Sequence, residues 1–232
     1  MKAWKQSFQE YVGGKDDPNA HEQILFERAQ KYIRRLTWIP GIEMIALVNS
    51  LSMLATHPDS DIDLFVITGK NRLWLVRILM TIILTLLGVR RSGKDIPGNF
   101  CLSFFLTTEA MNLEKIAIQN DIYLYYWIYY LRPMYSKNYT YDRFLASNPW
   151  VQLDIPQYQK NISDLKQVLG NQKENRVLDS LNALCCFIFE ARTRKTNAKL
   201  GNPWGVIISD GMLKFHPEDR RKEISEHFFG EK

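Results

Sequence analysis

Two aspartates separated by one residue, Asp61 and Asp63, have the types and spacing that most directly allow chemistry. They open the apolar run Ile62–Thr68, which has the length and composition of a buried strand. Alternate residues of a strand face the same side, so we expect the two carboxylates to lie a few ångström apart. Adjacent carboxylates repel, and Mg²⁺ relieves that repulsion because it prefers oxygen ligands. The pair predicts a metal site; a solvated turn is the alternative interpretation of so short a pattern.

Three predicted strands and one apolar helix must position this pair. The runs Ile42–Val48, Ile62–Thr68 and Phe100–Leu106 are typical of buried strands. The segment Leu73–Val89 is apolar at helical length, but its 17 residues are fewer than the roughly 20 that a membrane span needs, and Arg77 interrupts it. We therefore expect a helix packed against the sheet and no membrane contact.

The rest of the chain favours helices. They are predicted over His21–Leu36, Asp121–Leu131, Thr140–Ala146, Ser163–Leu169, Arg176–Lys195 and Pro217–Phe229. A short strand is predicted at Val206–Ile208. The expected fold class is α/β (α+β), a mixed sheet flanked by helices, with a core over residues 1–110 and a mainly helical region over residues 111–232.

Composition excludes several classes of protein. The chain has 232 residues, 46% hydrophobic and 24% charged, which excludes disordered, collagen-like and low-complexity sequences. A net charge of +5 is too small for a dedicated nucleic-acid binder. Three cysteines cannot form a disulfide framework, and the first residues contain no apolar targeting segment. These features predict a cytoplasmic protein.

The segment Asn49–Leu64 resembles the motif of the nucleotidyltransferase fold superfamily, the DNA polymerase β-like enzymes. That motif is a Gly-Ser at the end of a strand, a short helix and loop, and an Asp-x-Asp that opens the next strand. Ser50 precedes Asp61 by eleven residues, and the segment Pro58–Leu64 matches the typical sequence of the small bacterial and archaeal members at this motif. The resemblance covers roughly residues 42–106 and implies a nucleotidyltransferase-like sheet.

The resemblance implies transfer of NMP from an NTP to a hydroxyl acceptor with release of pyrophosphate, and ATP is the expected NTP. It implies that Asp61 and Asp63 are catalytic and bind two Mg²⁺ ions, which bridge the phosphates and the attacking hydroxyl. It also implies that Ser50 and the backbone at Asn49 hold the triphosphate at a helix N-terminus. Lys94 belongs to a basic loop expected beside this face, where phosphate contact competes with a solvated loop as the interpretation.

Asn49 and Leu54 stand where the superfamily commonly has glycine, and Met53 stands where it often has arginine. Asparagine tolerates the left-handed backbone region better than most residues, so the phosphate-binding turn remains feasible with Asn49.

A third carboxylate is expected on the next strand and is missing. The positions of matching parity are Asn99, Cys101 and Ser103, none of which is acidic. Asp95, Glu109 or a water molecule are the candidates to replace it. Loss of this general base would slow the reaction by powers of ten. The alternative function is therefore a catalytically inactive binding or regulatory module of the same fold, which would recognise a protein partner as an antitoxin does.

The acceptor must be recognised by the second half of the chain. The aromatic stretch Ile122–Leu131 is predicted to be core, with base stacking as the alternative. The basic segment Arg192–Lys199 is predicted to be a charged helix end, with RNA binding as the alternative. Cys185 and Cys186 are predicted to be core, and the histidines show no zinc-ligand spacing. We expect a small-molecule or protein hydroxyl as acceptor, in preference to RNA.

Overall fold

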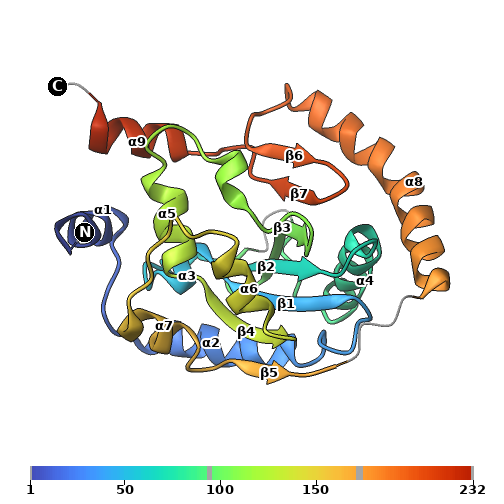
Figure 1. Cartoon of the computed structure of the whole chain (residues 1–232), viewed down its shortest axis with the longest axis horizontal. Helices are drawn as coiled ribbons and strands as arrows, with labels where there is room; N and C mark the ends of the chain where they lie inside the picture. The colour runs from blue at the N-terminus through green and yellow to red at the C-terminus, as the bar shows by residue number, and fades with distance from the viewer. Residues whose placement is uncertain (1, 93–95, 171–174, 231–232) are drawn as a thin grey trace.

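The computed structural model has a mixed sheet at its centre, with seven strands in the part of the chain that it describes (Figure 1). It describes residues 2–92, 96–170 and 175–230. The strands are β1 (Ile42–Leu47), β2 (Ile62–Thr68), β3 (Phe100–Thr107), β4 (Arg132–Lys137), β5 (Lys166–Val168), β6 (Val206–Ile208) and β7 (Met212–Phe215). Their order across the sheet is β5-β4-β1-β2-β3-β7-β6, which runs from bottom to top of Figure 1.

The directions of the central strands bring three chain segments to one edge of the sheet. β1 and β2 are antiparallel, whereas β2 and β3 are parallel. Parallel neighbours need a crossover connection, which the helix α4 (Leu73–Leu86) provides. The end of β1 and the starts of β2 and β3 therefore lie together. The short helix α3 (Asn49–Ser52) follows β1 at this edge.

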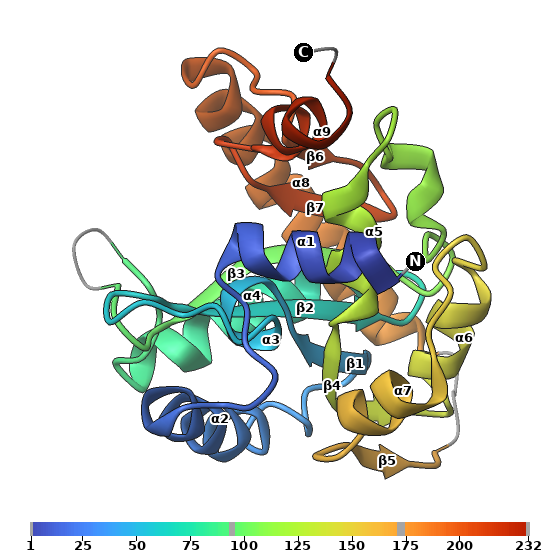
Figure 2. The ribbon, with the colours of Figure 1, turned by 90° about the vertical axis from the view of Figure 1, so that its left-hand side faces the viewer.

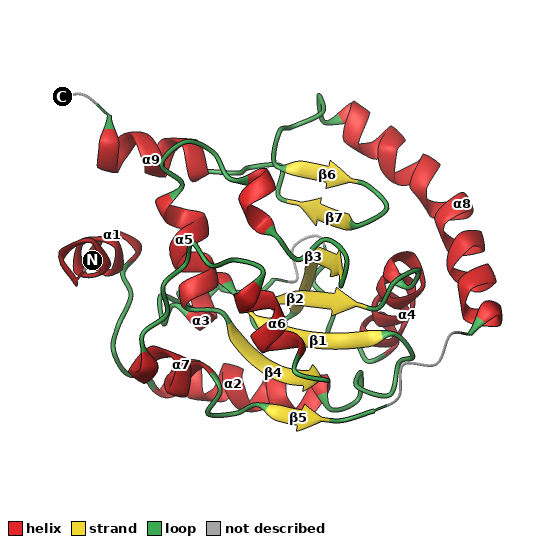
Figure 3. Cartoon of the chain, in the orientation of Figure 1, coloured by secondary structure: helices red, strands yellow, loops and turns green. Residues whose placement is uncertain are grey.

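Helices cover both faces of the sheet, as the red ribbons around the yellow strands of Figure 3 show. The remaining helices are α1 (Lys2–Val12), α2 (Ala20–Ile33), the 3-10 turn η1 (Leu113–Ile116), α5 (Ile122–Tyr129), α6 (Thr140–Ala146), α7 (Ile155–Asn161), α8 (Arg176–Lys199) and α9 (Arg221–Phe229). Figure 2 separates α2, on the left, from α6 and α7, on the right.

Two hydrophobic cores result from the alternation of side chains along the strands. Phe65 packs into a core with α1, α5, α6 and α9. Leu64 and Val66 point to the other face, into a core with α2, α4 and α8. Asp63 shares the parity of Phe65 and therefore belongs to the face that α5 covers.

The predicted fold class is confirmed, and the central elements match closely. β2 has the predicted bounds, β1 ends one residue earlier and β3 ends one residue later than predicted. α4 is buried against the sheet as predicted, and it ends at Leu86 because Gly88 adopts a left-handed backbone with φ of 66°. No helix in the described residues is both long enough and apolar enough to cross a membrane.

The second half of the chain departs from the prediction. Within the described residues, four of the seven strands come from beyond residue 110, in the region expected to be mainly helical, and they join the same sheet as the strands of residues 1–110. Ser163–Leu169 was predicted to be helical but contains β5. β4 was missed because Pro133 is unusual inside a strand; Pro133 lies at a register shift between β4 and β1, where a ladder hydrogen bond is not required. α9 begins at Arg221, four residues after the predicted start at Pro217.

α8 packs along α4 through one side only. The Asn182 side-chain oxygen accepts hydrogen bonds from the backbone N–H groups of Trp74 and Leu75, at 3.0 and 3.1 Å. Cys185 and Cys186 are half-buried on this side and pack against the edge of the core, so the prediction that they are core residues is confirmed in part. Few elements cover α8, and its outer side is exposed to solvent.

The aromatic cluster around Phe65 is expected to dominate the stability of the α5-covered core. Its ring centroid lies 5.0–5.4 Å from those of Phe104, Trp127 and Phe144. Phe65→Ala should lower the free energy of unfolding by about 3–5 kcal/mol, because it opens a cavity among packed rings. Urea denaturation measures the change. The control Phe187→Ala removes a ring that is 81% exposed on α8 and should change stability by less than about 0.5 kcal/mol. Equal effects of the two substitutions would contradict this description of the core.

Candidate functional site

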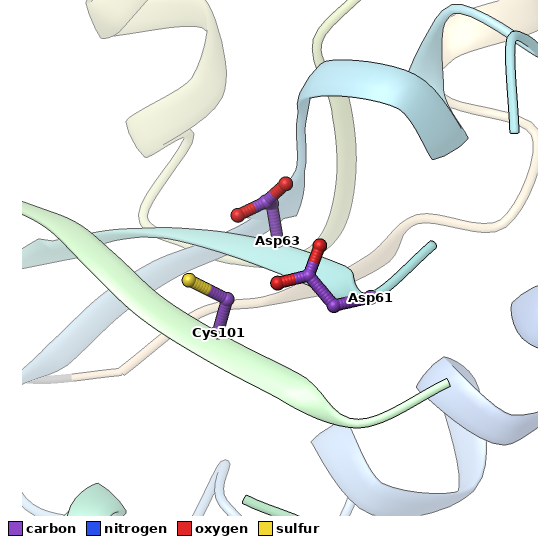
Figure 4. Close-up of side chains that lie close together, drawn as sticks. All are labelled: Asp61, Asp63 and Cys101. Atoms are coloured by element: carbon purple, nitrogen blue, oxygen red, sulfur yellow. The ribbon is translucent and has the colours of Figure 1, made fainter. Parts of the chain in front are cut away.

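Asp61, Asp63 and Cys101 lie together at the edge where β2 and β3 begin (Figure 4). Each offers one ligand atom, and these atoms all lie within 4.8 Å of one another. The prediction that Asp61 and Asp63 face the same side is therefore confirmed. Cys101 joins them because it pairs with Asp63 in the parallel register. From the sequence, Cys101 was expected only as a position that lacks the third carboxylate, and its place in this cluster was not predicted.

A β-bulge adjoins this cluster. Asp63 pairs with Cys101 but Phe65 pairs with Phe104, so β3 carries one extra residue between the two pairs. Cys101 and Phe104 therefore both reach the α5-covered face, and between them Ser103 lies near His216, with Oγ 3.4 Å from Nε2. Bulges commonly re-aim side chains beside active sites.

The electrostatics of the cluster favour a cation. Burial and, to a lesser extent, the charge of Asp61 raise the pKa of the Asp63 carboxyl to about 6. Burial and the charges of Asp63 and Asp61 raise the pKa of the Cys101 thiol to about 12. Arg91 compensates part of the negative charge through an ion pair with Asp61, Nη1 to Oδ2, at 2.8 Å. Additional positive charge at this point would favour the ionised form of Asp63.

Asn49 connects the cluster to α5. Its side-chain oxygen accepts hydrogen bonds from Trp127 Nε1 at 2.9 Å and from the Tyr123 hydroxyl at 3.3 Å. Its side chain also hydrogen-bonds the Asp63 carboxylate, which lowers the pKa of that group against the effect of burial. Only the backbone of Asn49 was expected to contribute to the site, whereas in the structure its side-chain amide helps to position Asp63.

The backbone at Asn49 and Leu54 has the geometry that glycine adopts readily. Their φ angles are 57° and 54°, in the left-handed region. These are the two positions at which the resembled superfamily has glycine. The turn therefore keeps a glycine-like shape with other residues, and asparagine accepts this conformation more easily than leucine does.

A cavity of about 650 Å³ lies beside α3. Asn49 and Ser50 line one side of it, and Tyr123 and Trp127 of α5 line another. The third side is the segment from β7 to α9, with Lys214, His216, Glu218, Asp219, Arg220 and Arg221. Asn49 is the residue that borders the cavity and also contacts Asp63, so the cavity and the carboxylate cluster are neighbours.

His216 carries an unused hydrogen-bonding atom at this cavity. Its Nδ1 is buried and has no hydrogen-bond partner among the described residues. Burial and the charge of Lys214 lower the pKa of the imidazole to about 4, so the ring is neutral at pH 7. The histidines lack zinc-ligand spacing in the sequence, and none of them was predicted to belong to the site. No local pattern singled out His216, because its neighbours come from other strands.

Buried ion pairs hold the β7–α9 wall in place. Arg221 contacts Asp121, the N-cap of α5, at 2.9 Å and Asp219 at 3.1 Å. Lys214 also pairs with Asp219. Burial alone would raise the pKa of Asp219, but hydrogen bonds from Lys214 and Arg221 lower it below its usual value. Through the contact of Arg221 with Asp121, this network fixes the wall against α5.

Other predicted site residues lie elsewhere. Lys94 and Asp95 fall outside the described residues. Glu109 follows the far end of β3 from Cys101 and pairs with Lys70 at 2.9 Å, so the suggestion that it supplies the third carboxylate is wrong. The basic segment Arg192–Lys199 lies at the end of α8, and no described residue of α8 lines the cavity.

The donor set fits one divalent cation better than two Mg²⁺ ions. The paired carboxylates supply oxygen ligands of the kind that Mg²⁺ prefers. The thiol of Cys101 occupies the third position, and sulfur is a poor ligand for Mg²⁺.

Comparison with models of known protein families found no match, and comparison with curated proteins found none either. The interpretation of the site therefore rests on its residues and their geometry.

Two replacements of Asn49 should distinguish the contribution of its hydrogen bonds to stability from the contribution of its backbone conformation. Asn49→Ala and Asn49→Gly both remove the acceptor of Trp127 and Tyr123. Asn49→Ala should be the less stable variant by about 1 kcal/mol, because a Cβ is unfavourable at positive φ. Urea denaturation measures the difference. Asn71 is the control: it is exposed and has a φ of 54°, so Ala and Gly there should differ by a similar amount without the loss of hydrogen bonds. Equal stability of the two Asn49 variants would show that the backbone relaxes.

The raised pKa of Asp63 predicts a pH-dependent loss of stability. Because the folded state favours protonated Asp63, protonation of this carboxyl stabilises the folded protein. Its contribution to the free energy of unfolding is complete below about pH 4 and is lost as the pH rises through about 6. In EDTA, Asp63→Asn should gain on the order of 2–3 kcal/mol over the wild type between about pH 4 and pH 8. Denaturation at several pH values measures the gain. Asp59→Asn changes an exposed position of the same loop, and its free energy of unfolding should depend on pH as that of the wild type does. If the free energy of unfolding of Asp63→Asn had the same pH dependence as that of the wild type, the pKa of Asp63 would not be raised.

Proposed function

We propose that this protein is a divalent-cation-dependent nucleotidyltransferase, which transfers NMP from an NTP to a hydroxyl acceptor and releases pyrophosphate. One observation carries the proposal: Asp61 and Asp63 lie side by side at the start of β2, with ligand atoms within 4.8 Å. Ser50 lies at the adjoining turn and lines the neighbouring cavity. This combination supports the activity implied by the resembled superfamily, with ATP as the first nucleotide to test.

Each residue of the site has a distinct role in this proposal. Asp61 and Asp63 bind the cation, and Asn49 holds the Asp63 carboxylate in place through its side-chain amide. Ser50 offers its hydroxyl to a phosphate oxygen in the cavity, and Arg220 adds positive charge at the cavity wall. When bound, a divalent cation supplies charge neutralisation at the phosphates and acidifies the attacking hydroxyl.

The cavity supports a small acceptor. It is bounded by α5 on one side and by the β7–α9 wall on another, and its lining combines aromatic rings with charged and polar side chains. Such a site suits a small molecule or a single side-chain hydroxyl of a protein. A long RNA would need a track of basic residues, and the basic end of α8 does not border the cavity.

We also place the proposed activity in the cytoplasm, away from membranes. The three cysteines are free thiols, as is usual in a reducing compartment. The apolar helix α4 contributes Leu73, Val76, Met80 and Leu84 to the core.

A catalytically inactive binding module is the second candidate. Cys101 replaces a carboxylate at the position of the general base, and Arg91 pairs with Asp61, where a cation would bind. Both features favour binding without turnover. Pyrophosphate release in the presence of NTP and candidate acceptors separates the two functions: release supports the enzyme, and nucleotide binding without release supports the module.

Nucleotide binding should depend on the paired carboxylates. Calorimetry with ATP in Mg²⁺ or Co²⁺ should give affinities about 100-fold weaker for Asp61→Asn/Asp63→Asn than for the wild type, because the phosphate-bridging cation is lost. Removal of the cation with EDTA should weaken wild-type binding to the same degree. The control Asp59→Asn removes an exposed carboxylate two residues before Asp61 and should bind like the wild type. Equal binding by all three proteins would refute the proposal.

A further inference from the structure

We propose that Cys101 supplies the third protein ligand of the Asp61–Asp63 site as a thiolate, and that the site selects a borderline-soft divalent cation of the Zn²⁺, Co²⁺ or Cd²⁺ type over Mg²⁺. The inference rests on the proposed use of the two aspartates as metal ligands and adds the identity of the cation. It follows from the disagreement between this donor set and the two Mg²⁺ ions that the superfamily resemblance implies.

The geometry suits a single cation with three protein ligands. A tetrahedral cation with bonds of about 2.0–2.3 Å holds its ligand atoms about 3.3–3.8 Å apart. The three ligand atoms here lie within 4.8 Å of one another, so a contraction of about 1 Å completes the site. Asp61 precedes β2 and is free of the β2–β3 ladder, so it can make most of that movement. Three protein ligands leave the fourth position for water or a phosphate oxygen.

The chemistry of the ligands determines the preference. Mg²⁺ is a hard cation that demands octahedral oxygen coordination and retains its waters. Thiolate is a soft ligand that selects Zn²⁺ and similar ions. Cys101 and Asp63 are register partners on neighbouring parallel strands, so the sulfur is held beside the carboxylate by the backbone of the sheet. A metal bound at Asp63 therefore meets sulfur at its next ligand position, and the thiol proton passes to solvent on binding.

The position of Arg91 shows where the site stabilises positive charge. Its Nη1 lies 2.8 Å from Asp61 Oδ2 and 3.8 Å from Cys101 Sγ. The guanidinium thus contacts two of the three ligand residues of the candidate site. The Arg91 side chain is 44% exposed, so it has room to move into solvent when a divalent cation replaces it. The Asp61 carboxylate and the Cys101 thiol already hold a cation in this structure, and a metal ion satisfies the same groups with shorter contacts.

Metal titration of the EDTA-treated full-length protein, without nucleotide, tests the inference. Calorimetry with Cd²⁺ and with Mg²⁺ should show Cd²⁺ binding about 100-fold tighter, and Co²⁺ should give a thiolate-to-cobalt charge-transfer absorption. Cys101→Ser should lose that absorption and weaken Cd²⁺ binding by about 10–100-fold. Cys101→Asp should reverse the preference by restoring an all-oxygen site for Mg²⁺. Circular dichroism and thermal melting in EDTA establish that each variant folds.

The half-buried thiols of α8 provide the matched control. Cys185→Ser/Cys186→Ser removes two cysteines away from the site and should leave the Co²⁺ spectrum and Cd²⁺ affinity at wild-type values. A Cys101→Ser protein that binds Cd²⁺ like the wild type, or a wild type that prefers Mg²⁺, would overturn the inference. If ATP binding still depends on Asp61 and Asp63 in that case, only the choice of cation fails. If neither cation binds the wild type, the proposed function fails with it.

Discussion

The repulsion between two carboxylates at the start of a buried strand is the constraint to which the rest of this site responds. Asp61 and Asp63 are brought to one face by strand geometry, and Asp63 is almost completely buried. Buried like charges are unfavourable unless a cation or hydrogen-bond donors accompany them. The protein provides Arg91 beside Asp61 and the Asn49 amide beside Asp63. These partners reduce the repulsion without abolishing it, and the remaining imbalance favours a cation.

The aromatic helix α5 is the second determinant, because it controls Asn49. Trp127 and Tyr123 donate to the Asn49 side-chain oxygen, which directs its amide nitrogen toward the carboxylate. Trp127 also packs against Phe65, two residues beyond Asp63 on the same face of β2. Core packing and site geometry are therefore coupled through a single helix. An otherwise ordinary hydrophobic cluster thereby sets the orientation of a catalytic carboxylate in the proposed enzyme.

The second half of the chain converts an exposed sheet edge into a cavity. β7 pairs with β3, and the segment that follows it is tied to α5 by the ion pair of Arg221 with Asp121 and to β7 by that of Asp219 with Lys214. Buried ion pairs of this kind add little net stability but penalise alternative arrangements, since one partner alone would be buried unpaired. The wall that faces Ser50 is accordingly well defined, and it places the neutral imidazole of His216 at the cavity.

The sequence alone determined the local features of this protein: the three central strands, the buried helix α4 and the shared face of Asp61 and Asp63, because periodicity and spacing act within one segment. It also indicated that Asn49 could adopt a left-handed backbone. Only the tertiary structure decided which residues complete the site. Cys101 joins through the parallel register of β2 and β3, Arg91 and His216 join from distant segments, and Pro133 became part of a strand at a bulge. Such contacts depend on strand order and register across the sheet, which the pattern of any single segment does not specify.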